Sequence, residues 1–326
     1  MVVKKTIKIV VTVIVLLSLL FGAYLYVLFH RLSPKKPENI GIRKNFKINW
    51  EGRVNILILG CDTRSSLNIG TRSDTMILIN VDFHEKKIKV LPIPRDLRVN
   101  VPGHGSDKAN STINSAYFDD GGIPLTLKTI EELLNIPIKL YVEVDFESFK
   151  KVIDSIGGLR YVVEKDMYYF DPTDNFLINL KEGDQILDGE KALQYVRFRN
   201  DEQGDFVVDN DGKVYGRVSR QITFIKELAK KLSEYKNVLK INNLVNIFTN
   251  YVETNISSTE LLKFAILFKN TSTEDDLQTF NMPSSNGYID GISYVIPDEE
   301  KIKELVINNF VDEATKKEME EPPSEP

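Results

Sequence analysis

The stretch of sequence that decides the fold runs from Val54 to Ile93 and reads VNILILGCDTRSSLNIGTRSDTMILINVDFHEKKIKVLPI. It contains three apolar runs separated by polar segments, at Val54–Leu59, Thr75–Val81 and Ile88–Ile93. Short apolar runs bounded by glycine, proline or charged residues are typical of buried strands. We therefore expect three strands, with the second and third joined by the polar turn at Asp82–Lys87.

Strand-like and helical patterns alternate along the rest of the chain. Further strands are expected at Leu140–Val144, Leu159–Val163, Leu277–Phe280 and Ile292–Val295. Helices are expected at Pro124–Leu134, Phe146–Ile156, Gly189–Val196, Gly216–Leu232, Leu244–Val252, Leu261–Phe268 (opened by a Ser257-x-x-Glu260 capping box) and Asp298–Phe310. This alternation predicts an α/β fold with a largely buried sheet.

The composition excludes several functional classes. The 326 residues carry a net charge of -5, which makes the chain a poor candidate for binding nucleic acid. The single cysteine, Cys61, excludes an intramolecular disulfide and a cysteine zinc cluster, and the three histidines have no metal-ligand spacing. Glycine-rich phosphate loops of the nucleotide-binding types are also missing from the sequence, so no nucleotide cofactor is expected.

The N-terminal region predicts a membrane anchor. Ile9–Phe29 carries no charged residue, and as a helix it would span roughly 32 Å, enough for a bilayer core. A cleaved signal peptide is the alternative, but the far end of the run is bulky and aromatic, without a small-x-small cleavage site. Lysines before the run favour an N-terminus inside the cell and a domain outside the cytoplasm. We expect a cytoplasmic segment 1–8, an anchor 9–29, a linker 30–50, a folded domain 51–311 and a disordered acidic tail 312–326.

Acidic and basic residues cluster at the ends of the first three predicted strands. Asp62 follows the first strand, Arg72 and Asp74 precede the second, and Arg95 follows the third. If the first two strands are antiparallel neighbours, these side chains meet at one sheet edge, which is the expected ligand crevice of an α/β sheet. Two carboxylates there suit a divalent cation bound together with phosphate oxygens. The alternative is that they are ordinary strand-end turn residues.

Arginines are concentrated in a second region. Four of the 12 arginines of the chain lie between positions 197 and 220. Arg197 and Arg199 would share a face if their segment is extended, and Arg217, Arg220 and Gln221 open a predicted helix whose N–H groups favour an anion. Because the arginine fork matches phosphate oxygens, this cluster predicts a phosphorylated or pyrophosphate substrate. Surface salt bridges with nearby acidic residues are the alternative.

With these clusters in this order, the sequence resembles the LytR–CpsA–Psr family of cell-envelope proteins. The resemblance extends over the anchor and about residues 50–311. The segments that carry the resemblance are Leu59-Gly60-Cys61-Asp62-Thr63-Arg64, Arg72-Ser73-Asp74-Thr75-Met76, Ile93-Pro94-Arg95-Asp96, Asn114-Ser115-Ala116-Tyr117, Val144-Asp145-Phe146, Leu187-Asp188-Gly189, Tyr195-Val196-Arg197-Phe198-Arg199 and Gly216-Arg217-Val218-Ser219-Arg220-Gln221. The resemblance implies a mixed central β-sheet flanked by helices, behind one transmembrane helix. It also implies transfer of a phosphoglycan, such as a wall teichoic acid or capsular polymer, from a polyprenyl-pyrophosphate carrier to peptidoglycan or a related acceptor.

The resemblance further implies roles for the matching residues. Asp62 and Asp74 would bind Mg²⁺, with Mn²⁺ as a substitute, and Asp74 is also the candidate general base. The pyrophosphate would be held by Arg72, Arg95, Arg197, Arg199, Arg217, Arg220 and Gln221, among which Arg95 and Arg199 are the expected catalytic arginines. Three alternatives remain: a pyrophosphate hydrolase, a non-catalytic polyprenyl-phosphate-binding module and a transcription regulator. The negative net charge and the predicted membrane anchor argue against the transcription regulator.

The sequence departs from the family pattern at two places. Relatives commonly carry a lysine where this chain has Thr112, and Lys108 lies four residues earlier. An insert, Val207–Tyr215, separates Asp205-Phe206 from the Gly216-Arg217 pair, and its Asp-Asn-Asp-Gly sequence predicts a hairpin-like turn at the rim of the site.

Overall fold

The computed structural model describes residues 47–61, 72–113, 121–172, 175–199, 207–208, 214–233, 252–257, 259–261, 263–264, 276–312 and 315–317. The predicted anchor, Asp62 and most of the linker and of the acidic tail lie outside these residues. Within them, no helix is both long and apolar enough to cross a bilayer.

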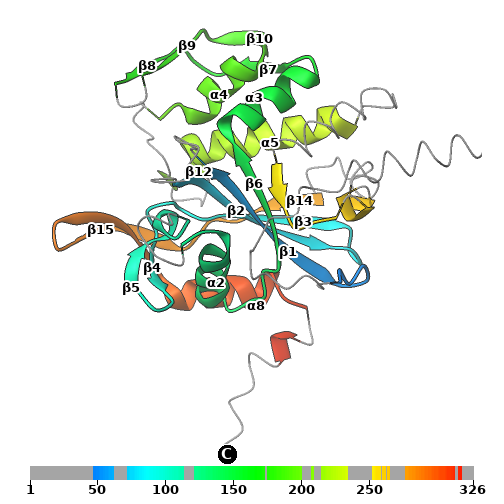
Figure 1. The fold of residues 1–326 in the computed structure, drawn as a ribbon, viewed down its shortest axis with the longest axis vertical. Helices are drawn as coiled ribbons and strands as arrows, with labels where there is room; N and C mark the ends of the chain where they lie inside the picture. The colour runs from blue at the N-terminus through cyan, green and yellow to red at the C-terminus, as the bar shows by residue number, and fades with distance from the viewer. Residues whose placement is uncertain are drawn as a thin grey trace, which may run out of the picture.

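A six-stranded mixed sheet forms the centre of the molecule (Figure 1). Its spatial order is β13 (Val252–Thr254), β6 (Leu140–Asp145), β1 (Arg53–Cys61), β2 (Ser73–Asp82), β3 (Lys87–Pro92) and β14 (Leu277–Thr279). The three strands expected from the opening stretch are neighbours, and β1–β2 and β2–β3 pair antiparallel. β1 pairs parallel to β6, so the α/β sheet predicted from the sequence is confirmed as a mixed one.

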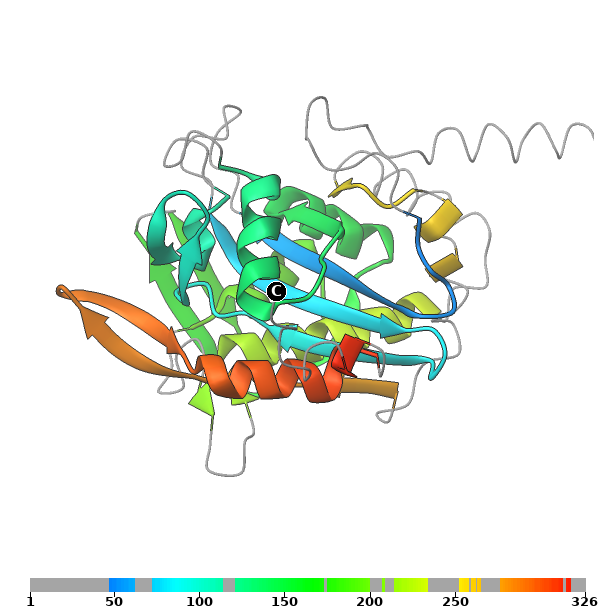
Figure 2. The same cartoon turned by 90° about the horizontal axis from the view of Figure 1, so that it is seen from below.

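Helices cover both faces of this sheet, as predicted (Figures 1 and 2). On one side lie α2 (Ile123–Leu134) and α8 (Glu299–Asn309); on the other lie α3 (Phe146–Ser155), α4 (Gly189–Arg197) and α5 (Arg217–Ser233). Aspartate N-caps fix three of these starts: Asp145, Asp188 and Asp298 each accept a hydrogen bond from the backbone N–H three residues later.

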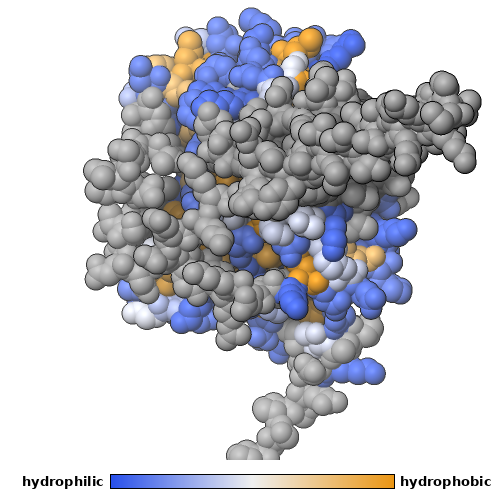
Figure 3. Space-filling model, turned by 45° about the vertical axis from the view of Figure 1, so that its right-hand side comes forward, coloured by the Kyte–Doolittle hydropathy of each residue, from blue (hydrophilic) through white to orange (hydrophobic). Residues whose placement is uncertain are grey.

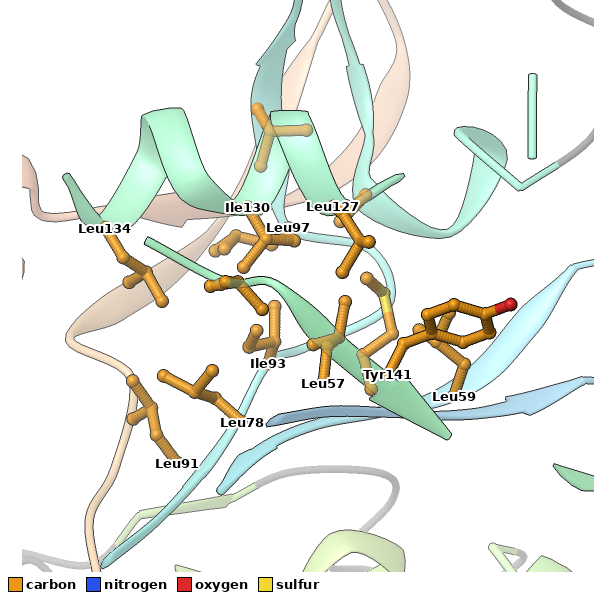
Figure 4. Close-up of a cluster of buried hydrophobic side chains, with 14 of the residues drawn as sticks. Leu57, Leu59, Leu78, Leu91, Ile93, Leu97, Leu127, Ile130, Leu134 and Tyr141 are labelled. Carbon is orange, nitrogen blue, oxygen red and sulfur yellow. The ribbon is translucent and has the colours of Figure 1, made fainter. Parts of the chain in front are cut away.

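The main core lies between the sheet and α2 with α8. Leu57, Leu78 and Leu91 from three adjacent strands meet Leu127, Ile130 and Leu134 of α2 (Figure 4). All six of these side chains are nearly or fully buried. Because alternate strand residues share one face, the apolar runs that predict the strands also supply this core. The described surface in Figure 3 is mainly hydrophilic, with apolar residues in small separate patches.

A second core holds α3, α4 and α5 beneath two small antiparallel pairs. One pair is β7 (Leu159–Val163) with β10 (Gly183–Leu187), and the other is β8 (Met167–Asp171) with β9 (Phe176–Leu180). Gly189 lets α4 approach α3 closely, because a Cβ there would lie 2.4 Å from the Lys150 carbonyl oxygen.

Several short elements were not predicted from the sequence. They include β8, β9, β10, the pair β4 (Arg98–Val101) and β5 (Gly105–Lys108), the short helix η1 (Ala109–Ser111) and β15 (Ser284–Ile289), which pairs with β16 (Ile292–Pro297). The hairpin-like insert is confirmed, because β11 (Val207–Val208) pairs with β12 (Val214–Tyr215).

The prediction of a helix over Leu244–Val252 was wrong at its last residue. Val252 begins β13 and pairs with Val144 of β6, and the other residues of that segment lie outside the described ones. Edge pairing with a buried strand overrides the local helical pattern here. The capping box at Ser257 and Glu260 is confirmed by reciprocal side-chain to backbone hydrogen bonds of 2.9 and 3.3 Å.

Candidate active site

The antiparallel pairing of β1 and β2 brings the end of one strand beside the start of the other. Gly60 lies opposite Thr75, and the register shifts between Gly60 and Cys61. A Cβ on Gly60 would lie 3.0 Å from the Thr75 Cβ, so glycine permits this close approach. The shift places Asp74 at the sheet edge where the chain also leaves β3 through Pro94 and Arg95.

Asp74 and Arg95 meet at this edge, as the sequence predicts. Arg95 donates from Nη1 to Asp74 Oδ1 at 2.7 Å, and both side chains are about one-fifth exposed, at 23% and 19%. Arg95 also donates from Nε to Asp96 Oδ2 at 3.3 Å. The guanidinium is therefore fixed between two carboxylates while part of it remains accessible to a ligand.

Lys108 supports this arrangement from β5. Its Nζ donates to Asp96 Oδ1 at 2.9 Å. Burial alone would raise the pKa of Asp96, but the hydrogen bond from Lys108 and the charge of Arg95 hold that pKa below its usual value. Thr112 lies in a different environment: it is fully buried, and its hydroxyl donates to the Ala109 carbonyl.

One pocket joins the sheet edge to the first turn of α5. It is lined by Asp74, Arg95 and Asp96 from the sheet side, by Arg217, Val218 and Gln221 from α5, by Val295 of β16, and by Thr75, Met76, Ile77, Pro92, Ile93 and Pro94. Two regions more than 100 residues apart in the chain thus supply one carboxylate–arginine site. The N-terminal N–H groups of α5 add a partial positive charge to the arginines.

Arg197, Arg199 and Arg220 lie around Phe198 rather than among the residues that line this pocket. Arg197 was expected in an extended segment, but it is the last residue of α4, and its guanidinium stacks 4.4 Å from the Phe176 ring centre. Arg199 follows it and is exposed. The helix α4 continues to Arg197 because Asp188 caps its start and Phe198, at its C-terminal end, packs into the core.

Arg220 and Gln221 attach α5 to the end of α4. Arg220 is 6% exposed and donates from Nη2 to the Phe198 carbonyl at 2.5 Å, with Nη1 3.7 Å from Glu164 Oε1. Gln221 donates from Nε2 to the Val196 carbonyl at 3.1 Å. The segment that carries Arg199 is therefore tied to the pocket wall. Arg72, just before β2, is exposed, and Asp62 lies outside the described residues.

A half-buried acidic group next to this edge was not singled out in the sequence. Glu143 of β6 lies opposite Leu59 of β1 and opposite Glu253 of β13. Burial, followed by the charge of Glu253, raises the pKa of Glu143 to about 7. Burial also raises the pKa of the Cys61 thiol, to which Glu143 is hydrogen-bonded. In the sequence, a glutamate that alternates with valines in a strand only weakly indicates a carboxyl with a raised pKa, because the sequence does not show which face of the strand is covered.

The donor set fits Mg²⁺ better than a transition metal. Among the described side chains, no three His, Cys, Asp or Glu converge on one point. A site with few carboxylates beside several arginines suits a hard cation that takes its remaining ligands from water and phosphate oxygens. Asp74 and Asp96 are the described carboxylates that line the pocket, beside Arg95 and Arg217.

Known proteins are similar to this chain in sequence. Regulatory protein MsrR of Staphylococcus aureus is 34% identical over 248 residues, covering 76% of this chain and 69% of MsrR. The polyisoprenyl-teichoic acid–peptidoglycan teichoic acid transferase TagV of Bacillus subtilis is 33% identical over 77% of this chain and 62% of TagV.

Solved structures are also similar to this chain. The crystal structure of Bacillus subtilis TagV matches with a TM-score of 0.64 and 31% identity, covering 79% of this chain and 97% of that one. TagT bound to LIIa-WTA matches with a TM-score of 0.60 and 26% identity, covering 88% and 97%. The model of the LytR_cpsA_psr family matches residues 28–309, and the chain belongs to that family.

Proposed function

We propose that this protein is a Mg²⁺-dependent phosphotransferase of the cell envelope. It transfers a phosphoglycan from a polyprenyl-pyrophosphate carrier to peptidoglycan or a related wall acceptor and releases polyprenyl phosphate. The observation that carries the proposal is the pocket in which the Asp74–Arg95 pair faces Arg217 and Gln221 at the start of a helix. A relative named as a teichoic acid transferase and a matching structure bound to LIIa-WTA support the substrate class.

The residues of the pocket suit the charge of a pyrophosphate diester, which carries about two negative charges. Arg95, positioned by Asp74 and Asp96, would hold the phosphate nearer the glycan, and Arg217 with the α5 N-terminus would hold its neighbour. Arg72, Arg197 and Arg199 would complete the binding of the donor, while Arg220 positions the segment that carries Arg199. Mg²⁺, held by Asp74 and Asp62, would neutralise charge that develops on the phosphate oxygens.

The reaction is a displacement at the glycan-side phosphorus. The oxygen of an acceptor sugar hydroxyl forms a bond to this phosphorus, the bond to the bridging oxygen breaks, and polyprenyl monophosphate leaves with the electron pair. Asp74, whose carboxylate lines the pocket, is the candidate that accepts the hydroxyl proton, a role that competes with binding of the metal. Arg217 stabilises the charge on the leaving phosphate, and Arg95 stabilises the charge on the attacked phosphate.

The location follows from the same proposal. A polyprenyl carrier is held in the membrane and the acceptor lies in the wall, so the domain acts at the outer face of the cell membrane. The uncharged run Ile9–Phe29 would anchor it by a single span with the N-terminus inside.

The test uses the full chain in detergent with Mg²⁺, a labelled polyprenyl-pyrophosphate oligosaccharide and uncrosslinked peptidoglycan. We expect label on peptidoglycan that disappears in Asp74→Ala and persists in Asp184→Ala, a control at an exposed acid on β10. Label released to water without any need for acceptor would replace the proposal by a hydrolase. Label that stays on lipid bound to the protein would replace it by a binding module.

A further inference from the structure

The β15–β16 hairpin projects from the body of the molecule (Figures 1 and 2). Its base is fixed to the site, because Val295 N donates to the Asp96 carbonyl at 2.9 Å and the Val295 side chain lines the pocket. Each strand has six residues, so the hairpin extends about 20 Å. A surface of this length continues directly from the candidate active site.

The register of the hairpin shows which residues continue the pocket wall. Val295 pairs with Asn286, and Tyr288 pairs with Ser293. Directly paired and alternate residues of a hairpin share one face, so Asn286, Tyr288 and Ser293 lie on the face that begins with Val295. Asn286 and Ser293 are exposed, and Tyr288 is 79% exposed.

The opposite face is not equally open. Tyr294 pairs with Gly287, is half-buried, and lies with its ring centre 5.5 Å from Lys108 Nζ. Ile296 on this face is also half-buried and lies where a Cβ on Gly287 would come within 3.0 Å of its Cγ1. At its base the opposite face is therefore covered by its own side chains and by β5, although Ser285 and Ile292 on that face are exposed. The pocket-side face is the one that continues the pocket wall.

We propose that the pocket-side face of this hairpin, Asn286, Tyr288 and Ser293, binds an uncharged glycan strand and presents its hydroxyl to the pocket. An aromatic ring offers an apolar platform for a sugar ring, and amide and hydroxyl groups pair with sugar hydroxyls. This inference rests on the proposed function and assigns the face to the acceptor glycan. It differs from the pyrophosphate site in both its residues and its chemistry.

The charge of the hairpin indicates which glycan, that of the acceptor or that of the donor, binds this face. Ser284–Pro297 contains no lysine or arginine, and its one charged residue is Asp290 at the tip. A phosphate-bearing polymer needs cationic partners, of which arginine is the usual one. An uncharged amino-sugar strand needs none, so the acceptor is the glycan that fits this face.

The test measures binding of chitohexaose, an uncharged hexamer of N-acetylglucosamine, to the full chain in detergent by titration calorimetry. We expect Tyr288→Ala to raise the dissociation constant at least fivefold and Tyr288→Phe to preserve binding. The matched control is Tyr168→Ala, which removes a tyrosine of similar exposure, 70%, from β8 and should bind as the unmodified chain does. In the transfer assay, Tyr288→Ala should raise the KM for peptidoglycan and leave the KM for the donor unchanged.

Several outcomes would overturn the inference. They are no chitohexaose binding by the unmodified chain, equal losses in Tyr288→Ala and Tyr168→Ala, or Tyr288-dependent binding of poly(glycerol phosphate) in place of chitohexaose. The proposed function is tested separately: Tyr288-dependent binding without any transfer would overturn the reaction and keep the glycan site. Transfer with an unchanged KM in Tyr288→Ala would overturn the glycan site and keep the reaction.

Discussion

Lys108 holds Asp96 through a hydrogen bond of 2.9 Å, and that carboxylate in turn accepts a hydrogen bond from Arg95. The three side chains are each about one-quarter to one-third exposed, so the pairs are screened only in part. Lys108 thus reaches the candidate site through Asp96.

Removing Lys108 should loosen Arg95 without removing it. A hydrogen bond between charged groups contributes roughly 1.5–3 kcal/mol, and partial exposure reduces this, so we expect Lys108→Ala to lower kcat about tenfold. Lys108→Arg should restore most of the rate, and Lys181→Ala, at an exposed pair with Asp166, should leave it unchanged. A normal kcat in Lys108→Ala, measured in the peptidoglycan transfer assay, contradicts the positioning role.

Arg95 should contribute far more to the rate of transfer than to the stability of the fold. Loss of one group that stabilises transition-state charge typically costs about 3–4 kcal/mol, so Arg95→Ala should reduce transfer by two to three orders of magnitude with the fold intact. We expect a loss of the same order for Arg199→Ala, whose side chain is exposed. Transfer rates and circular dichroism check both variants, and near-normal transfer by either one refutes the role assigned to it.

Glu143 should make the stability of the protein depend on pH. Its folded-state pKa of about 7 lies above the ordinary value of 4.5, so between these values the folded chain holds a proton that the unfolded chain has lost. Stability should therefore fall as the pH rises from about 4.5 to 7 and level off above it. Glu143→Gln should remove this slope and raise the free energy of unfolding at pH 8 by up to about 3 kcal/mol.

Urea unfolding at several pH values, in the presence of a chelator, measures this effect. Glu132→Gln, at an exposed position of α2, is the control and should keep the pH profile of the unmodified chain. An unchanged profile in Glu143→Gln would show that the carboxyl is ionised in the folded state at neutral pH.

Gly189 should tolerate no side chain. A Cβ there would lie 2.4 Å from the Lys150 carbonyl oxygen, and the neighbouring atoms are backbone that cannot rotate away. Gly189→Ala should separate α4 from α3 and destabilise the domain by about 1–3 kcal/mol. The exposed Lys191→Ala on the same helix should change the thermal midpoint little, and equal midpoints for the two variants would contradict the packing argument.

The sequence by itself determined the parts of the fold whose patterns are local and strongly apolar. The runs at Val54–Leu59, Thr75–Val81 and Ile88–Ile93 became β1, β2 and β3 because each buries side chains on the sheet, and the strand ends brought Asp74 beside Arg95. The arginines from position 197 onward could be recognised as a cluster because arginine is scarce in this chain.

Only the tertiary structure decided which of these arginines share one pocket. Arg217 and Gln221 join Asp74 across the fold, while Arg220, four residues from Gly216, turns to the Phe198 carbonyl. Burial raises the pKa of Glu143, and pairing at a sheet edge makes Val252 a strand residue. The physical reason is common to these cases: burial, charge and pairing depend on residues distant in the chain, and a local pattern records none of those neighbours.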